Sequence, residues 1–305
     1  MDVNNKAAAR EKLYSLLGDL PDRKRPISAH LIEEKDCGDY VLENLLLDLN
    51  GIETVPAYVA KPKNAKGRLP CVIYNHYHGG LYHLGRKEFI MDERPYYVNE
   101  SYAKILTGLG YIAICIDAWN FGERSGRNEL ELFKEMIWKG QVLWGMMVYD
   151  YLRSVDYAVS RDDVDSRKIA TMGLSLGSTA AWWLAALDER ISLTVDIGGA
   201  SDFDELLRTG GHQWHGIYYY VPSLLKHFSS ADIMALIAPR KRLSLNGRYD
   251  ALTPIEGLYK IDAALKAEYA RCGAPENWRM VIENCAHMET SNMRRQIIDF
   301  FRANF

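Results

Sequence analysis

The pentapeptide Gly173-Leu174-Ser175-Leu176-Gly177 carries the clearest chemical signal in the sequence. The apolar stretch IATMGL ends within it, and the helical stretch STAAWWLAAL begins just after it. Glycines two residues before and after a serine permit a tight turn from strand to helix, which raises the hydroxyl above the sheet edge. The helix N-terminus then faces any negative charge that develops beside the serine. The pattern predicts a nucleophilic Ser175; the alternative is a purely structural turn.

His287 is the candidate base for this serine. A serine hydroxyl is a weak nucleophile and needs a neighbouring group to take its proton. Of the eight histidines, His287 alone lies in the last 70 residues. It follows the strand-like stretch WRMVIENC, so a loop would present it at the carboxyl edge of a sheet. A lone histidine is often just a surface residue, but a position between a last strand and a terminal helix favours the base.

An acid must orient the base and stabilise its protonated form. Asp250 lies just beyond the strand-like stretch KRLSLNG, at the same predicted edge. The turn at Gly173–Gly177 is of the type called a nucleophile elbow. In folds that carry such an elbow, the catalytic residues follow one another along the chain in the order serine, aspartate, histidine. Asp202 and Glu283 are the rivals, and Glu283 ranks last because a carboxylate within a strand is poorly placed to reach a loop histidine. We predict that Asp250 is the acid.

Two backbone N–H groups are expected to stabilise the oxyanion of an attacked carbonyl. The N–H of Leu176, directly after the serine, is the first donor. The second should come from the loop after the strand-like stretch CVIYNH, where Gly79-Gly80 allows close approach of the backbone to a substrate. We expect the N–H of His78 or of Tyr77, and the sequence does not choose between them.

The same loop has a metal-binding alternative. His76, His78 and the nearby His83 resemble the H-x-H-x-D-H pattern of metallohydrolases. Gly80 and Leu81 stand where the acid and the third histidine are needed, so the set of ligands falls short of what zinc requires. We therefore expect no metal and no organic cofactor.

The elements around these residues predict an α/β fold with a mostly parallel sheet and helices on both faces. Short continuous apolar stretches alternate with helical patterns from residue 69 onward, which is typical of parallel strands buried on both sides. Predicted strands are 69–76, 111–117, 167–174, 191–199, 241–247 and 278–285; predicted helices are 98–110, 131–160, 178–187 and 293–305. Such folds bind ligands at the carboxyl ends of the strands.

Residues 1–62 form the first of two predicted regions, the second being a catalytic domain over 63–305. Residues 4–17 show a helical pattern with Ala8, Leu13, Leu16 and Leu17 near one face. Strand-like stretches 39–49 and 52–62 flank Asn50-Gly51, a strong hairpin signal. We predict an N-terminal helix and antiparallel edge strands.

Residues 201–240 interrupt the alternation of strands and helices. This segment is rich in aromatic residues and histidines and is predicted to be an insertion over the carboxyl edge, forming a lid or a pocket wall. Candidate pocket residues are Trp214, His215 and Tyr219 from the insertion, with Trp119 from the loop after the second parallel strand. A structural role is the alternative for His212 and His215.

For Trp182 and Trp183 we expect core packing, and for Glu123 and Arg124 a surface salt bridge.

Composition limits the class of protein. The chain has 305 residues, is 48% hydrophobic and 25% charged, and carries a formal net charge of −3, so a nucleic-acid partner has no support. Five scattered cysteines form neither a disulfide framework nor a zinc pattern. With no apolar signal core and no stretch of 18 apolar residues, we expect a cytoplasmic protein without a membrane partner. A homo-oligomer is compatible with this composition.

The segments GLSLG, HYHGG, RYDALTP and CAHMET resemble the α/β-hydrolase superfamily. Within it, residues 60–300 are similar to the dienelactone hydrolase and acetyl xylan esterase-like serine esterases, and DAWNFGERSG (117–126) matches as well. Dienelactone hydrolases use a cysteine nucleophile, so Ser175 argues against that activity. Relatives carry His-Gly where this chain has His76-Tyr77. The resemblance implies an α/β-hydrolase fold with a Ser-His-Asp triad.

The leading hypothesis is a serine-dependent carboxylic ester hydrolase that acts on a small-molecule ester. A small acyl group, such as acetyl, on a larger alcohol is implied by the family. One alternative is a peptidase of the prolyl oligopeptidase type, although about 60 N-terminal residues are too few for a propeller of several four-stranded blades. Another is a catalytically silent binding protein on the same fold. A thioesterase or a lactonase fits the same residues.

Overall fold

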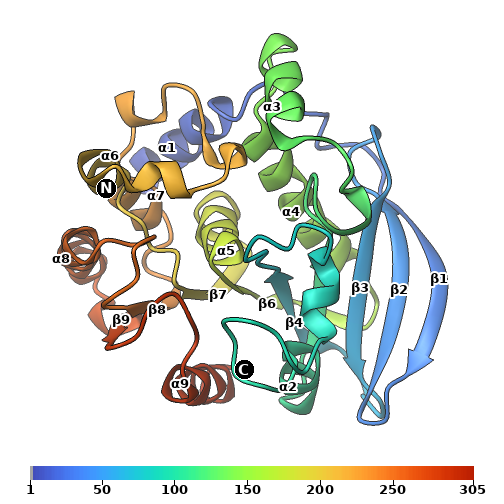
Figure 1. Cartoon of the computed structure of the whole chain (residues 1–305). Coiled ribbons are helices and arrows are strands. Elements are labelled where there is room, and N and C mark those ends of the chain that lie inside the picture. Colours follow the sequence, from blue (N-terminus) through green and yellow to red (C-terminus); the bar gives the residue numbers. More distant parts are fainter. Residues whose placement is uncertain (1–2) are drawn as a thin grey trace.

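The computed structural model describes residues 3–305, which build one sheet flanked by helices (Figure 1). Within that part of the chain the sheet has nine strands in the order β1-β2-β3-β5-β4-β6-β7-β8-β9. The strands are β1 Ser28–Asp36, β2 Tyr40–Asp48, β3 Val55–Pro62, β4 Leu69–Asn75, β5 Ile112–Ile116, β6 Val164–Leu174, β7 Ile191–Ile197, β8 Lys241–Gly247 and β9 Trp278–Glu283. Neighbours from β5 to β9 pair in parallel, and β1, β2, β3 and β5 pair antiparallel. The predicted fold class is confirmed.

Helices cover both faces of the sheet. They are α1 Val3–Ser15, α2 Tyr102–Gly108, α3 Glu129–Trp138, α4 Leu143–Ser160, α5 Leu176–Leu187, α6 Phe203–Thr209, α7 Ser230–Ala235, α8 Ile255–Arg271 and α9 Ser291–Arg302. Side chains of α1, α4, α5, α7 and α8 enter one buried cluster, and those of α2 and α9 enter another. Successive residues of β4 alternate between the two, with Cys71 and Ile73 in the first and Val72 and Tyr74 in the second, as the pleat requires.

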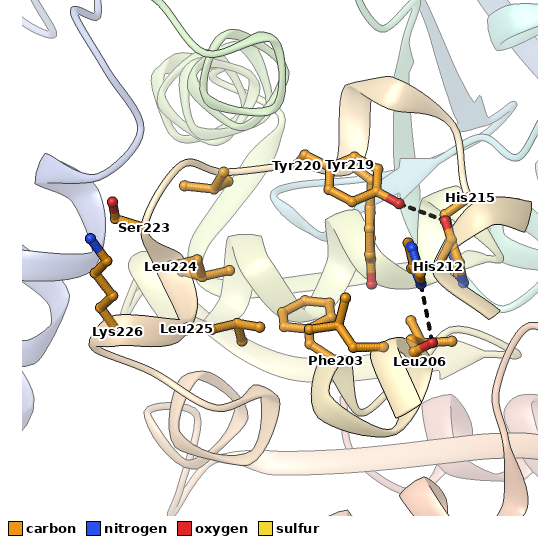
Figure 2. A pocket seen from close by; sticks show the side chains of 12 residues that line it. Phe203, Leu206, His212, His215, Tyr219, Tyr220, Ser223, Leu224, Leu225 and Lys226 are labelled. Carbon is orange, nitrogen blue, oxygen red and sulfur yellow. Dashed lines mark hydrogen bonds between the residues drawn. The ribbon is translucent and has the colours of Figure 1, made fainter. Parts of the chain in front are cut away.

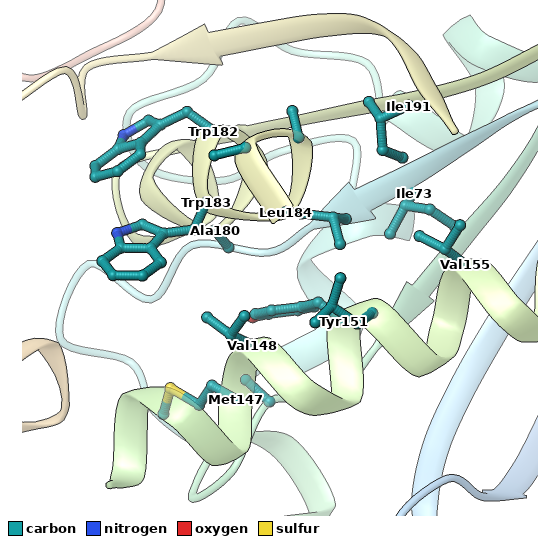
Figure 3. Close-up of a cluster of buried hydrophobic side chains, with 14 of the residues drawn as sticks. Ile73, Met147, Val148, Tyr151, Val155, Ala180, Trp182, Trp183, Leu184 and Ile191 are labelled. Carbon is teal, nitrogen blue, oxygen red and sulfur yellow. The ribbon is translucent and has the colours of Figure 1, made fainter. Parts of the chain in front are cut away.

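The elbow helix α5 packs in the larger of these clusters (Figure 3). Trp182 and Trp183 are buried there, beside Met147, Val148 and Tyr151 of α4, so the predicted core role of the two tryptophans is confirmed. The indole N–H of Trp182 also donates to the carbonyl of Gly199 at 3.0 Å. Because aromatic side chains bury a large apolar area, this packing stabilises α5 against the core.

The N-terminal region agrees with its prediction in part. β2 and β3 form the expected antiparallel pair around Asn50-Gly51, with Tyr40 opposite Pro62 and Leu47 opposite Val55. β1 was not predicted: all nine of its residues are exposed, so it has no pattern of buried positions. Leu13 of α1 and Leu17, just after its end, are buried as expected, but Ala8 of α1 is exposed.

Three other expectations need correction. The predicted helix over 131–160 is two helices, α3 and α4, because the chain turns at Gly140, which has a φ of 76°. Helix α8 was not predicted. The predicted surface salt bridge of Arg124 is only partly right, because its side chain is 3% exposed and pairs both with the exposed Glu53 at 2.6 Å and with the buried carboxylate of Asp150 at 2.9 Å. Glu123 pairs instead with Arg86 at 2.8 Å.

The insertion 201–240 consists of α6, α7 and three short 3₁₀ helices, with no strand in its length. It lies over the sheet on the side of α5 and α8 (Figure 1). Among the described residues, no helix is both long and apolar enough to cross a membrane. The cysteines of the described chain are all unbridged, and Cys71 and Cys115 are buried as small apolar groups, as predicted.

Candidate active site

Ser175 occupies a strained turn between β6 and α5. Its φ of 57° and ψ of −118° lie outside the regions that side chains with a Cβ favour. A Cβ at Gly173 would lie 2.5 Å from the carbonyl oxygen of Asn75, and one at Gly177 would lie closer still. Both glycines are therefore required by β4, which passes directly beside the turn. Strain of this kind persists where the surrounding structure enforces it, and it is concentrated at functional sites.

His287 and Asp250 form the hydrogen bond that the sequence predicted. The Nδ1 of His287 lies 2.7 Å from Oδ2 of Asp250, and the aspartate side chain is fully buried while the histidine is 18% exposed. A carboxylate can only accept, so Nδ1 carries the proton and Nε2 has a free lone pair. The other oxygen of Asp250 accepts from the N–H of Leu252 at 2.9 Å, which fixes the carboxylate. The geometry suits a base held by an acid.

The two rival acids have other partners. Asp202 caps helix α6 by accepting from the N–H of Glu205 at 2.9 Å. Glu283 accepts from the hydroxyl of Thr290 and the amide of Asn292, both at 2.6 Å. Neither carboxylate is bonded to His287, so the structure places Asp250, and not Asp202 or Glu283, beside the histidine.

A cavity of about 400 Å³ joins most of the predicted site residues. Ser175, Leu176, His78, His287, Trp214, His215 and Tyr219 line it. Its other lining residues include Thr179, Tyr96 and Tyr218, which the sequence analysis did not single out. Trp119 was predicted to line the pocket but does not: it is buried, with Arg124 over its ring, 4.5 Å from the ring centre. Tyr77 does not line the cavity either.

The backbone N–H of Tyr77 is close enough to the buried carboxylate of Glu88 to influence its pKa. Burial raises the pKa of Glu88 to about 7, and the opposing influences come from Arg94, Tyr74 and this N–H. Glu88 is itself held by Arg94 at 2.6 Å and by the hydroxyl of Tyr74 at 2.9 Å. Because the N–H of Tyr77 serves this buried carboxylate, His78 is the better placed of the two candidate donors.

His78 is locked as a neutral ring. Its Nδ1 accepts from the N–H of Gly80 at 3.0 Å, so its Nε2 carries the proton and donates to the hydroxyl of Tyr218 at 2.9 Å. Burial lowers the pKa of His78 to about 4, and the nearby His76, His287 and His215 lower it further. Burial also lowers the pKa of His215. His78 and His215 therefore stay uncharged near neutral pH, which leaves His287 as the histidine held by a carboxylate.

The depressed pKa of His78 predicts a pH-dependent stability. The unfolded chain binds a proton near the ordinary histidine pKa, whereas the folded chain does not until about pH 4, so the free energy of unfolding falls as the pH falls through this window. A shift of this size is worth about 3 kcal/mol between pH 7 and pH 4. The free energy of unfolding of wild type and of His78→Gln is measured in urea from pH 7 to pH 4. The decrease over this range should be about 3 kcal/mol smaller for the variant than for wild type. Parallel curves would contradict the burial of a neutral His78.

The loop that carries His287 has its own support, which the sequence analysis missed. Glu289 is buried, accepts from Arg294 at 2.6 Å, and also accepts from the backbone N–H of Val98 at 3.2 Å. The ring of Tyr96 lies edge-on to His287, with 6.0 Å between ring centres. The signal for Glu289 was its place two residues after the histidine, but one of its partners, Val98, comes from a distant part of the chain.

The metal alternative at His76 and His78 is not favoured by the geometry. The Nε2 of His76 accepts from the N–H of Ala118 at 3.1 Å, and its Nδ1 lies 3.1 Å from the carbonyl oxygen of Tyr77. His78 likewise uses both ring nitrogens. Over residues 3–305 no group of three or more histidine, cysteine or acidic side chains is arranged to hold a metal ion.

Comparisons with known proteins place the chain in a family. No protein-family model matches it. The "Putative hydrolase YtaP" of Bacillus subtilis (strain 168) is 47% identical over 297 residues, which cover 97% of this chain and 99% of YtaP. Among solved structures, a glucuronoyl esterase from Solibacter usitatus superposes with a TM-score of 0.71 at 15% identity, covering 99% of this chain and 94% of the esterase. Acetyl xylan esterase 1 from Thermoanaerobacterium sp. JW/SL YS485 gives 0.66 at 13% identity, covering 98% and 93%.

The likeness to the two esterases concerns the fold, because their sequences are so distant. The likeness to YtaP extends over nearly the whole of both chains and is close in sequence. The chain therefore has the α/β-hydrolase fold of these esterases and belongs to the family of the putative hydrolase YtaP.

Proposed function

We propose that the protein is a serine-dependent carboxylic ester hydrolase. The observation that carries this proposal is a single cavity that contains Ser175 on its strained turn and His287 held by the buried Asp250. The structural similarity to the two esterases and the sequence similarity to the putative hydrolase YtaP support ester hydrolysis as the reaction class. A fold alone does not define an activity, so the proposal rests on the site.

The reaction proceeds through an acyl-enzyme. The Ser175 hydroxyl attacks the ester carbonyl while Nε2 of His287 takes its proton, and the N–H groups of Leu176 and His78 stabilise the oxyanion. His287 then gives its proton to the leaving alcohol oxygen, which breaks the carbonyl–oxygen bond. In the second half a water molecule attacks the acyl group, His287 takes the water proton, and Ser175 is released with the carboxylic acid.

The acyl group is proposed to be small, such as acetyl. One of the structural neighbours is named as an acetyl xylan esterase, and the sequence resemblance implies the same class. The proposed substrate is a small-molecule ester, with neither nucleic acid nor a membrane as partner. The peptidase alternative is weaker, because residues 3–62 form α1 and the paired strands β1 to β3 in place of a large gating domain.

Labelling with a fluorophosphonate tests the nucleophile. Wild type should react stoichiometrically, and Ser175→Ala should not, because the probe requires an activated serine. The same preparations are assayed with p-nitrophenyl acetate and butyrate, and with a dipeptidyl p-nitroanilide for the peptidase alternative. Folded wild type that does not react would point to a silent binding protein, and labelling that persists in Ser175→Ala would exclude this serine.

A further inference from the structure

A second cavity lies within the insertion, beside the catalytic one (Figure 2). Its volume is about 400 Å³, and its walls are mostly hydrocarbon. Phe203, Leu206, Val221 and Leu224 are among the residues that line it. Apolar cavities of this size take ligand groups of similar chemistry, because transfer of an apolar surface out of water is favourable.

His215 and Tyr219 form the wall between the two cavities, since both residues line each of them. Their rings are stacked, with 5.0 Å between ring centres and 17° between planes. In Figure 2, His215 and His212 lie at one end of the second cavity and Ser223 and Lys226 at the other. The latter two are exposed, so that end faces solvent.

The shared wall lies on the side of the triad acid. The Nε2 of His215 lies 3.2 Å from the carbonyl oxygen of Leu252, two residues after Asp250. His215 is also close enough to His287 and Asp250 for both to influence its pKa. In serine hydrolysis the protonated histidine delivers its proton to the leaving group, so the alcohol part of an ester lies on the histidine side of the serine.

We propose that the second cavity is an alcohol-side subsite that binds an aromatic ring or similar apolar group of the substrate's alcohol. The inference rests on the proposed ester hydrolysis and specifies its substrate. An ester whose alcohol extends over the rim of the His215–Tyr219 pair places its carbonyl at Ser175 and its apolar end among Leu206, Val221 and Leu224. The catalytic cavity, which is the more polar of the two, then holds the ester itself.

The test is a pair of acetate esters that differ in the size of the alcohol. Phenyl acetate and 2-naphthyl acetate have leaving groups of similar acidity, so their intrinsic reactivities are comparable. The value of kcat/KM should be at least about tenfold higher for 2-naphthyl acetate, because the added ring is buried. Lengthening the acyl chain from p-nitrophenyl acetate to octanoate should give no such gain. Equal values for the two aryl acetates, or a gain on the acyl side instead, would overturn the proposal.

A second test of the subsite uses variants in which a larger side chain fills the cavity. Leu207 and Leu225 line it and are 50% and 42% exposed, so tryptophan can be introduced at either without opening the core. Leu207→Trp and Leu225→Trp should each bring the naphthyl-to-phenyl ratio of kcat/KM down toward one. Leu130→Trp is the matched control, because Leu130 is 47% exposed on α3 and lines neither cavity. A ratio that the filling variants leave unchanged would contradict the subsite.

Binding of the alcohol itself separates this inference from the proposed function. Fluorescence titration of Ser175→Ala with 2-naphthol should show saturable binding that the added substitution Leu225→Trp weakens at least about tenfold. If no ester is hydrolysed and 2-naphthol still binds, the proposed function fails while the cavity stands as an aromatic site. If esters are hydrolysed and 2-naphthol does not bind, the subsite fails and the function stands.

Discussion

Replacing His287 by alanine is expected to lower kcat for ester hydrolysis by about 10⁶-fold. Loss of a triad histidine costs about as much as loss of the whole triad, because the nucleophile then has no base. The other two histidines that line the cavity are not arranged in the same way, since His78 uses both ring nitrogens and His215 is bonded to the carbonyl of Leu252 and not to a carboxylate. The measurement is kcat on phenyl acetate at saturating substrate, with unfolding curves to confirm a folded variant.

His83→Ala is the matched control for this experiment. His83 is exposed and lies close in sequence to the glycine loop, but it does not line the catalytic cavity. Its loss should leave kcat within about twofold of wild type. Comparable losses in the two variants would revive the metal alternative at His76, His78 and His83, and added imidazole should restore part of the rate to His287→Ala if a base is what is missing.

Asp250→Asn is expected to lower kcat by about 10⁴-fold. The amide has nearly the shape of the carboxylate, but its NH₂ group donates, so it favours the His287 tautomer with the proton on Nε2 and removes the lone pair that the serine needs. The 2.7 Å contact to Nδ1 and the complete burial of the Asp250 side chain make this effect direct. The assay is the same, followed over pH.

Asp202→Asn and Glu283→Gln are the controls, because these carboxylates were the rival acids. Asparagine is as good a helix N-cap as aspartate, so Asp202→Asn should remain folded and retain most of its activity. Glu283→Gln keeps the side-chain shape beside Thr290 and Asn292. If Asp202→Asn lost 10⁴-fold and Asp250→Asn did not, the assignment of the acid would be wrong.

The parts of the site that depend on local chain geometry could be predicted from the sequence. The elbow needs its two glycines because β4 passes beside them, and this requirement is visible as a five-residue pattern. The contact between Asp250 and His287 could be predicted because parallel strands bring their carboxyl ends to one edge. Strands β4 to β9 were predicted from the alternation of apolar stretches with helical patterns, and β2 and β3 from the hairpin signal at Asn50-Gly51. Strand β1 was not predicted, because its nine exposed residues give no signal of a buried face.

The parts that depend on long-range partners could not be predicted. The preference for His78 over Tyr77 as the second donor depends on the cavity lining and on the carboxylate of Glu88, 11 residues further along the chain than Tyr77. Arg124 had the sequence context of a surface residue, and it is buried because Asp150 of α4 lies beneath it. The second cavity arises from the way the insertion folds back on itself, and neither spacing nor composition specifies that path.

The exposed strand β1 bears on how copies of this protein behave toward one another. An edge strand has unpaired N–H and C=O groups that can bond to a strand of another chain. A flat edge therefore favours edge-to-edge aggregation. Here the pairing of β1 with β2 is interrupted by a bulge between Leu31 and Glu33, and the strand continues through Glu34, Lys35 and Asp36. The bulge twists the edge, and the charges must lose water before another strand can pair. Both features disfavour pairing of β1 with the β1 strand of a second copy of the chain.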